Sequence, residues 1–319
     1  MKKLKILFLG TPDFAVETLS KLHQHFDIVG VVTAPDKPSG RGRKVNQSAI
    51  KKYACKQNIE VLQPTNLKSD SFQSDLKRLK PNLAIVVAFR MLPEKVWNFP
   101  KYGTFNIHAS LLPNYRGAAP INWAIMNGEK ETGVTSFFLD EKIDTGAIID
   151  ARRIQIEKGE TAGSLHDKLM QLGADLAVET ARAIAEERIE TTLQTKLSEN
   201  KEAPKLNKEN TQIRWDQDAD KILDFINGLY PYPLAWSSLE ERERTIQIKV
   251  GKVEIDETIE QKAEIGDLIF GKNKLSVKAK NAWLSIQELK YPGKRMLKTQ
   301  DFLNGYDQDK AVKMHSSES

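Results

Sequence analysis

The sequence predicts an α/β fold in which a Rossmann-like, open, parallel-rich sheet is followed by a small OB-like β-barrel. Over roughly the first two hundred residues, short apolar runs rich in β-branched residues alternate with helical patterns, as in sheets whose parallel strands are buried on both faces. Beyond a polar segment, several short alternating runs are separated by turn residues, which is typical of a small barrel. The chain has 319 residues, more than most single cores contain, so we expect two domains.

The N-terminal elements are expected in the order strand, helix, strand. Apolar runs predict strands at KILFLG (5–10), IVGVVTA (28–34) and LAIVVAF (83–89). Helical spacing predicts one helix from Phe14 and a long one within 161–189. The parallel strands would be joined by right-handed crossovers.

The second domain is predicted to begin after a linker. Residues 190–207 are mostly polar and contain Pro204, which suits a connecting segment. This places the first domain at 1–189, the linker at 190–207 and the second domain at 208–319. Within the second domain, DADKILDFINGL predicts a short helix, and strands are expected at TIQIKV, DLIFG, KLSVKA and AWLSIQEL.

Composition limits the class of protein. With 40% hydrophobic and 29% charged residues, the chain suits a soluble globular protein. No apolar run reaches the roughly 18 residues that cross a bilayer, and Met-Lys-Lys leads into KILFLG without a signal pattern, so we expect a cytoplasmic protein. Cys55 is the single cysteine. This excludes an internal disulfide and a thiolate metal cluster, and we expect Cys55 to be a small buried residue.

Residues 103–120, GTFNIHASLLPNYRGAAP, carry the clearest chemical signal. Asn106 and His108 would point to the same side of a strand, at the carboxyl end where open α/β sheets bind ligands. An amide and an imidazolium there could stabilise the oxyanion of an acyl transfer, and Asp144 could supply a carboxylate that favours the charged imidazole or accepts a proton. A structural role for this Asn-x-His pair stays open at this point. A metal site is not expected, because no second His or Cys lies at ligand spacing.

Basic residues cluster in two places. Residues 37–56 contain seven basic residues and no acidic one, and residues 266–298 contain eight against two acidic ones. Such clusters are compatible with a solvated surface or with a polyanionic partner.

The run NIHASLLPNYRGAAPINWAI, followed by GVTSFFLDEKIDTGAII, resembles the 10-formyltetrahydrofolate-dependent formyltransferases, and within that family the members that act on methionyl-tRNA. The similarity extends over nearly the whole chain through GTPDFAVETL, PDKPSGRGRK, YPYPLAW and PGKRM. It implies a catalytic first domain, a tRNA-binding second domain and a monomeric protein, with 10-formyltetrahydrofolate and initiator methionyl-tRNA as substrates and no metal.

The resemblance also implies roles for individual residues. Asn106 and His108 would stabilise the oxyanion, while Asp144 keeps His108 charged and helps to remove the proton of the attacking amine. The folate would lie against two loops, and its expected contacts are Phe89, Arg90, Met91, Leu92, Ser110, Leu111, Leu112, Pro113 and Asp140. Arg90 stands where the family usually has glycine. It is expected either to pair with the glutamyl carboxylate of the folate or to be a surface residue.

The basic clusters gain a meaning from the same resemblance. The loop PDKPSGRGRK would enter the acceptor arm of the tRNA, and phosphate contacts from Lys and Arg would make this binding salt-dependent. The expected tRNA contacts are Arg41, Arg43, Lys44, Lys272, Lys274, Lys294 and Arg295, with Lys278 and Lys280 as further candidates.

Three other functions were compared with this one. A glycinamide ribonucleotide formyltransferase would use a glycine-rich first loop for phosphate, whereas GTPDFAV has one glycine. An enzyme that formylates an amino sugar nucleotide is the main alternative, but it does not require the basic loop at 37–44. A non-catalytic RNA-binding protein would not need the complete Asn106, His108 and Asp144 set.

Overall fold

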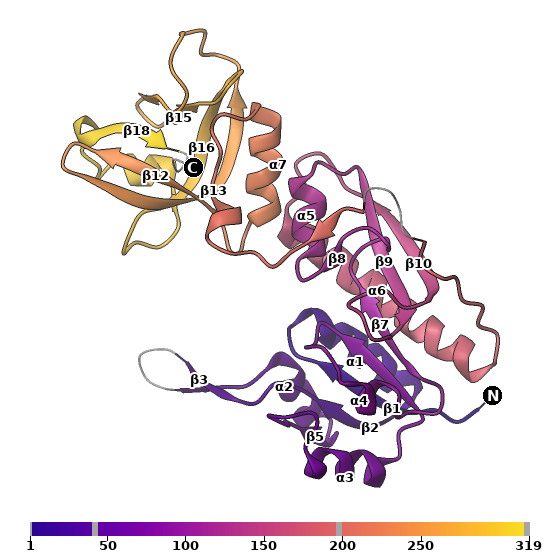
Figure 1. The fold of residues 1–319 in the computed structure, drawn as a ribbon. Coiled ribbons are helices and arrows are strands. Elements are labelled where there is room, and N and C mark those ends of the chain that lie inside the picture. The colour runs from indigo at the N-terminus through magenta and orange to yellow at the C-terminus, as the bar shows by residue number, and fades with distance from the viewer. Residues whose placement is uncertain (1, 40–43, 196–199, 316–319) are drawn as a thin grey trace. The chain divides into compact units, whose positions relative to one another are not determined.

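The structure, a computed structural model, describes residues 2–39, 44–195 and 200–315. The chain forms two compact units (Figure 1). Unit 1 comprises Met1–Gly117, Glu131–Ile154 and His166–Glu202, and unit 2 comprises Ala118–Lys130, Gln155–Leu165 and Ala203–Ser319. Two short segments of the predicted first domain therefore group with the C-terminal unit. The boundaries 1–189, 190–207 and 208–319 stay a prediction.

Unit 1 is built on a seven-stranded, mostly parallel sheet. Its strand order is β10-β9-β7-β6-β1-β2-β5. The pairs β1–β2, β1–β6, β2–β5 and β6–β7 are parallel, and β7 pairs antiparallel with β9. The predicted α/β class is confirmed. The strands are β1 (Lys5–Gly10), β2 (Asp27–Val32), β5 (Val61–Leu62), β6 (Leu83–Val87), β7 (Thr104–His108), β9 (Glu131–Phe138) and β10 (Ile148–Gln155).

Apolar side chains on both faces fix the central strands of this sheet. All five residues of β6 and all but the first of β1 are buried, as expected for parallel strands covered by helices. One core cluster joins Leu7, Val86 and Phe72, so it links the sheet to helix α3. The helices that lie wholly or mostly in this unit are α1 (Phe14–His25), α2 (Ala49–Lys56), α3 (Asp70–Leu79), α4 (Glu94–Trp97) and α6 (Ala162–Ala185).

One expectation about this unit is wrong. Cys55, near the end of α2, is exposed rather than buried. The buried face of α2 carries Ile50 and Ala54 instead, and Cys55 lies one position beyond this face.

The basic loop that follows β2 has regular structure at its base. Two short strands, β3 (Lys37–Ser39) and β4 (Lys44–Asn46), pair antiparallel, with Lys37 opposite Asn46 and Ser39 opposite Lys44. The predicted contacts Arg41 and Arg43 lie outside the described residues. The described ends of the segment PDKPSGRGRK are therefore paired as two antiparallel strands.

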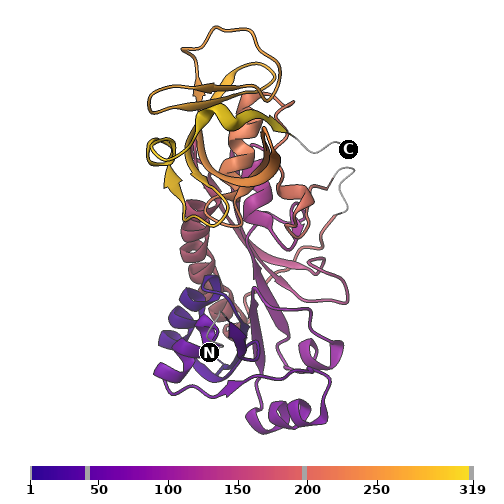
Figure 2. The same cartoon turned by 90° about the vertical axis from the view of Figure 1, so that its left-hand side faces the viewer.

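Unit 2 contains an antiparallel sheet that curves into a nearly closed barrel (Figure 2). The sheet order is β14-β15-β16-β13-β12-β18, with β17 paired to β16. The elements are α5 (Pro120–Met126), β11 (Glu202–Ala203), α7 (Ala219–Leu229), β12 (Ala235–Glu241), β13 (Arg244–Asp256), β14 (Leu268–Phe270), β15 (Leu275–Lys278), β16 (Trp283–Lys290), β17 (Leu297–Lys298), α8 (Thr299–Leu303) and β18 (Ala311–His315). A two-residue strand, β8 (Arg116–Gly117), belongs to unit 1.

Gly266 closes the barrel by bringing the start of β14 against β18. The N–H of Met314 donates to the Gly266 carbonyl at 2.9 Å. Gly266 has φ of +88°, and a Cβ there would lie 2.1 Å from the Met314 carbonyl oxygen. Only glycine therefore fits this position without a shift of the backbone. The predicted small barrel is confirmed.

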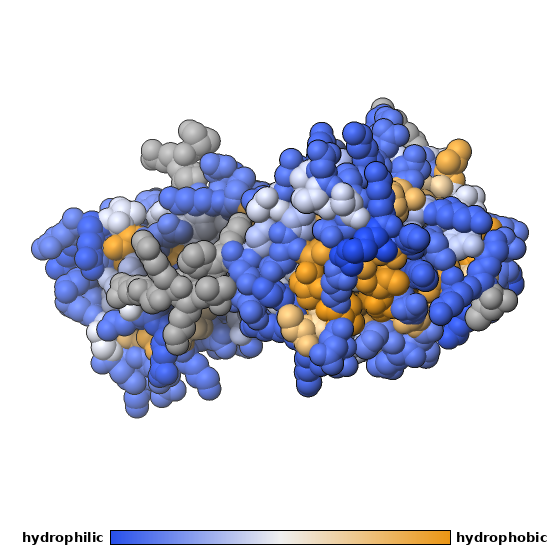
Figure 3. Space-filling model, turned by 90° about the horizontal axis from the view of Figure 1, so that it is seen from below, coloured by the Kyte–Doolittle hydropathy of each residue, from blue (hydrophilic) through white to orange (hydrophobic). Residues whose placement is uncertain are grey.

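The surface is largely hydrophilic on the face seen in Figure 3, where one apolar area interrupts it. Among the described residues, no helix combines the length and the apolar character that a membrane span requires.

Candidate active site

The predicted site lies at the carboxyl end of β7, one of the inner strands of the unit 1 sheet. Asn106 lies opposite Val86 of β6 and Phe137 of β9, and His108 lies opposite Thr135. His108 is only 6% exposed. Because side chains alternate along a strand, Asn106 and His108 share a face of β7.

The loop after β7 is held by a hydroxyl of the neighbouring strand. The Thr135 hydroxyl donates to the Ser110 carbonyl at 2.7 Å and accepts from the Leu112 N–H at 3.2 Å. The Ser110 hydroxyl donates to the Asn114 carbonyl at 2.7 Å. The Leu112–Pro113 peptide is cis. These contacts fix the chain between His108 and the turn at Tyr115.

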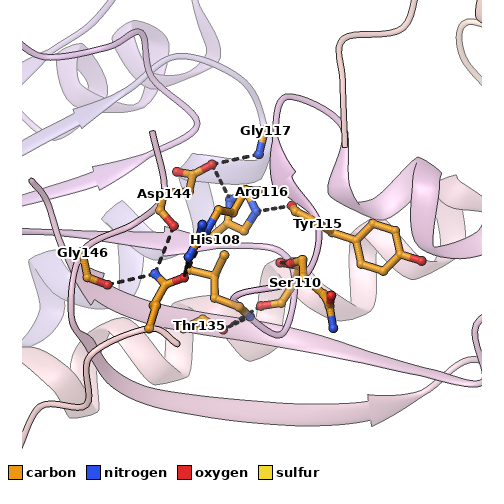
Figure 4. A network of polar contacts seen from close by, with 11 residues as sticks. His108, Ser110, Tyr115, Arg116, Gly117, Thr135, Asp144 and Gly146 are labelled. Atoms are coloured by element: carbon orange, nitrogen blue, oxygen red, sulfur yellow. Dashed lines mark hydrogen bonds and ion pairs between the residues drawn. The ribbon is translucent and has the colours of Figure 1, made fainter. Parts of the chain in front are cut away.

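The orientation of the His108 ring is set by the backbone of this turn (Figure 4). Nε2 lies 2.8 Å from the Tyr115 carbonyl oxygen. A carbonyl can only accept, so Nε2 carries the hydrogen. Nδ1 then faces the Asp144 carboxylate, at 3.8 Å from Oδ2. This separation is too long for a hydrogen bond, so Nδ1 stays available to a substrate atom.

Asp144 is held on the same turn. Its Oδ2 accepts the Gly117 N–H at 2.9 Å, and its side chain is 12% exposed. Asp144 has φ of +55°, in the left-handed region that non-glycine residues seldom adopt. Asp140 shapes the start of the loop, since its carboxylate accepts the Thr145 hydroxyl at 2.7 Å and the Lys142 N–H at 3.0 Å.

A glycine allows the Asp144 loop to approach the end of β9. A Cβ at Gly146 would lie 1.7 Å from the Phe138 carbonyl oxygen, and the Phe138 N–H donates to the Ala147 carbonyl at 3.0 Å. The position of Asp144 therefore depends on the absence of a side chain two residues later.

Asn106 has an unsatisfied polar atom. Its Oδ1 is buried and finds no hydrogen-bond partner within the part of the chain that the structure describes. Buried polar atoms are nearly always paired, and an exception in a native structure requires an explanation. A ligand that supplies a donor at this position would satisfy Oδ1.

The predicted folate contacts fall into three segments, which follow β6, β7 and β9. Leu92 is buried, Met91 is 66% exposed, and Ala88 at the start of the first loop has φ of +49°. The Arg90 guanidinium donates to the carbonyls of Pro64 and Thr65. Arg90 is exposed, as a surface residue would be, and these contacts stabilise a neighbouring loop; its pairing with the folate stays a prediction. The remaining contacts, Ser110, Leu111, Leu112, Pro113 and Asp140, belong to the loops on either side of His108 and Asp144.

The predicted tRNA contacts differ in their surroundings. Lys44 lies in β4. Lys274 forms an ion pair of 2.5 Å with the buried Asp256, and Lys280 forms one of 3.2 Å with Asp218. Lys278 lies over the Trp283 ring, 5.9 Å from its centroid. Lys272, Lys280, Lys294 and Arg295 are exposed.

Sequence reasoning did not single out Gln194, which contacts the loop of Asp144. Its amide nitrogen donates to the Asp144 and Gly146 carbonyls, and its oxygen accepts from Arg116. Gln194 lies in a polar segment predicted as a linker, and no periodicity or motif marks it.

Comparison with family models matches both parts of the chain. Residues 3–181 match the model described as "Formyl transferase", and residues 205–307 match "Formyl transferase, C-terminal domain". Curated relatives match over nearly the full length. The chain is 50% identical over 306 residues to a methionyl-tRNA formyltransferase of Flavobacterium johnsoniae, covering 96% of this chain and 97% of that one. It is 46% identical over 321 residues to the same enzyme of Bacteroides fragilis, covering 98% and 99%.

Solved structures at lower identity share the fold. HypX from Aquifex aeolicus, in complex with tetrahydrofolic acid, superposes with a TM-score of 0.64 at 19% identity. The match covers 95% of this chain, which spans about half the length of HypX (47%). An N-formyltransferase from Helicobacter canadensis, in complex with folinic acid and dTDP-3-aminofucose, gives a TM-score of 0.64 at 21% identity and covers 89% of this chain and 98% of that one.

Proposed function

This chain belongs to the formyl transferase family, and we propose that it transfers the formyl group of 10-formyltetrahydrofolate to the amino group of initiator methionyl-tRNA. The observation that carries this proposal is the near-full-length similarity to methionyl-tRNA formyltransferases at 46–50% identity, through both domains. Formylation of methionyl-tRNA prepares it for translation initiation. The geometry around His108 and Asp144 provides a route for the reaction.

The chemical step is an acyl transfer. The amino nitrogen of the methionyl group forms a bond to the formyl carbon, the bond from that carbon to the folate nitrogen breaks, and one proton passes from the amine to the departing nitrogen. Between these events the formyl oxygen carries negative charge, so donors placed around this oxygen lower the barrier.

Two side chains of β7 supply these donors. The His108 ring is fixed by its Nε2 contact with Tyr115, so Nδ1–H of the imidazolium is free to donate to the oxyanion. Asp144 is too far from Nδ1 to take this hydrogen, at 3.8 Å, but its charge is close enough to stabilise positive charge on the ring. The Asn106 amide donates to the same oxyanion.

The unsatisfied oxygen of Asn106 can bind the second substrate of the reaction, the attacking amine. The nitrogen of the attacking amine gains positive charge as it bonds to the formyl carbon. The buried Oδ1 of Asn106 is an acceptor for one of its N–H groups. Asp144 accepts the proton that must leave the amine. The residues present therefore fit both the formyl donor and the amine.

The folate is proposed to lie against residues 88–93 and the loop that carries Asp140 and Asp144, with further contacts from residues 110–113. Exposed Met91 and the neighbouring backbone groups suit a flat ring with polar edges. The tRNA is proposed to contact the β3–β4 hairpin through Arg41, Arg43 and Lys44, and the barrel through Lys272, Lys274, Lys294 and Arg295. These contacts would position the nucleic acid without reading its sequence.

The proposal is tested by incubating the purified chain with 10-formyltetrahydrofolate and methionyl-tRNA, free methionine or an amino sugar nucleotide, and by identifying the formylated product by mass spectrometry. Formylmethionyl-tRNA alone is expected. Free methionine lacks the phosphates that the basic hairpin would contact, so it should react far more slowly. Formylation of the sugar nucleotide in preference to the tRNA would overturn the substrate assignment.

A further inference from the structure

We propose that Gln194 is a positioning residue that holds Asp144 in its catalytic place, and that Arg116 acts through Gln194. This inference rests on the proposed formyl transfer and adds a residue to its machinery. The segment that contains Gln194 would then be a working part of the site, although its composition predicts a connecting linker.

The Gln194 amide is fully used in joining two parts of the site. Nε2 donates to the Asp144 carbonyl at 3.0 Å and to the Gly146 carbonyl at 2.8 Å. Oε1 accepts from Arg116 Nε at 3.1 Å and from Nη2 at 2.5 Å. If the amide were turned over, its N–H groups would face those of Arg116, and its oxygen would face the carbonyl oxygens of Asp144 and Gly146. The contacts therefore fix both the position and the direction of this side chain.

Backbone pairing brings Gln194 to this place. Thr192 and Ile148 exchange two hydrogen bonds of 2.8 Å, one in each direction, so the segment lies beside the start of β10. The side chain of Leu193 is 80% exposed, whereas its neighbour Gln194 is partly buried. Within this segment, Gln194 thus faces the Asp144 loop, to which it is hydrogen-bonded.

Asp144 needs such support because its backbone conformation is unfavourable. With φ of +55°, Asp144 lies in the left-handed region that non-glycine residues seldom adopt, and such residues persist where their surroundings hold them. Gln194 binds the carbonyls on both sides of Thr145, while the Gly117 N–H binds the Asp144 carboxylate. The loop is thereby held at its backbone and at its side chain.

The same contacts relate Asp144 to His108. Tyr115 accepts from the His108 ring, Arg116 binds Gln194 and Gly117 binds Asp144. Three consecutive residues of one turn thus contact His108, Gln194 and Asp144 in order. Gln194 links this turn to the backbone of the Asp144 loop. The distance between the imidazole and the carboxylate therefore depends on Gln194.

The first test compares Gln194→Ala with Leu193→Ala in the full-length chain. Gln194→Ala is expected to lower kcat for formylation of methionyl-tRNA roughly 10- to 100-fold, as misplaced catalytic groups do, with KM for both substrates nearly unchanged. Leu193→Ala removes an exposed side chain from the same segment and should leave kcat unchanged. Full kcat in Gln194→Ala would overturn the inference.

The second test separates positioning from a general loss of structure. In an Asp144→Asn background, Gln194→Ala should add no further loss, because its effect passes through the Asp144 carboxylate. An additional loss as large as in the wild-type background would overturn the inference.

A third measurement does not depend on activity. The Gly117 N–H donates to Asp144, so its hydrogen exchange should accelerate in Gln194→Ala and not in Leu193→Ala. Unchanged exchange would overturn the inference even if the wild-type chain did not formylate methionyl-tRNA. Inactivity of the wild-type chain with methionyl-tRNA would instead overturn the proposed function, so the two failures are distinguishable.

Discussion

His108 and Asp144 meet at the carboxyl end of the sheet, with Nδ1 of the ring 3.8 Å from Oδ2 of the carboxylate. Both side chains are bound by backbone groups of one turn, His108 by the Tyr115 carbonyl and Asp144 by the Gly117 N–H. Replacing a side chain moves the backbone little. Each of the two groups should therefore keep its position when the other is replaced, so their contributions can be measured separately.

Asn106→Ala and Asp144→Asn are expected to lower kcat for formyl transfer while folate binding changes little. Loss of one oxyanion donor costs roughly 10²- to 10³-fold, and loss of a general base costs roughly 10²- to 10⁴-fold. Asn at 144 can still accept the Gly117 N–H, so the loop should stay in place. Single-turnover kinetics and equilibrium folate titration provide the two measurements. Near-normal turnover in both variants would remove these residues from the mechanism.

The sequence predicts the interior of the fold better than its edges. Strands such as β1 and β6 could be predicted because they are apolar over nearly their whole length. Strand β10 could not, because it lies at the edge of the sheet, alternates between exposed and partly buried residues and carries Arg152 and Arg153. An edge strand has one neighbour and does not need a continuous apolar run.

The site shows the same division. Asn106, His108 and Asp144 are residue types whose chemistry can be inferred from sequence. The contribution of Gln194 comes from two hydrogen bonds to backbone carbonyls, which leave no pattern in the residues that receive them. The role of Tyr115 toward His108 likewise uses its carbonyl, and any residue has a carbonyl.

Gly146→Ala is expected to reduce activity by displacing the Asp144 loop. The added Cβ would lie 1.7 Å from the Phe138 carbonyl oxygen, so the backbone must shift, at a typical cost of about 1–3 kcal/mol. Activity and thermal unfolding should both be measured. Gly305→Ala is the matched control, since a Cβ there meets nothing within 4 Å. Equal behaviour of the two variants would show that the loop tolerates the shift.

Asp36→Asn is expected to weaken tRNA binding by loosening the base of the β3–β4 hairpin. The Asp36 carboxylate accepts from Lys51 at 2.5 Å and from Gln63 at 2.8 Å, and these hydrogen bonds lower its pKa. The carboxylate therefore contributes fully above its usual pKa, and this contribution is lost only as pH falls through the lowered value. We expect Kd for tRNA to rise roughly threefold to tenfold.

The sign of this effect discriminates between two explanations. Removing a negative charge near a polyanion should tighten binding if only long-range electrostatics mattered. Asp27→Asn, at the exposed start of β2, makes the same change in net charge and controls for this term. Filter-binding or fluorescence titrations at fixed salt would measure both variants. Tighter binding by Asp36→Asn would contradict an anchoring role.

Asp256→Asn is expected to destabilise the barrel at neutral pH, and the difference from the wild type should disappear in acid. Burial alone would raise the pKa of the Asp256 carboxyl, but hydrogen bonds from Lys274, Thr258 and Ser276 outweigh it and lower the pKa from 3.8 to about 2. A depressed carboxyl pKa stabilises the folded state above pH 3.8, and this stabilisation is lost as pH falls toward about 2.

The measurement is the urea midpoint of the full-length chain between pH 7 and pH 2, followed by tryptophan fluorescence. Trp283 is 2% exposed and lies opposite Asp256 on β16, so its emission reports on this part of the barrel. Glu254→Gln, on the same strand but exposed, should leave the midpoint unchanged at every pH. A deficit of Asp256→Asn that stayed constant down to pH 2 would mean that lost packing, and not the charge of Asp256, causes the destabilisation.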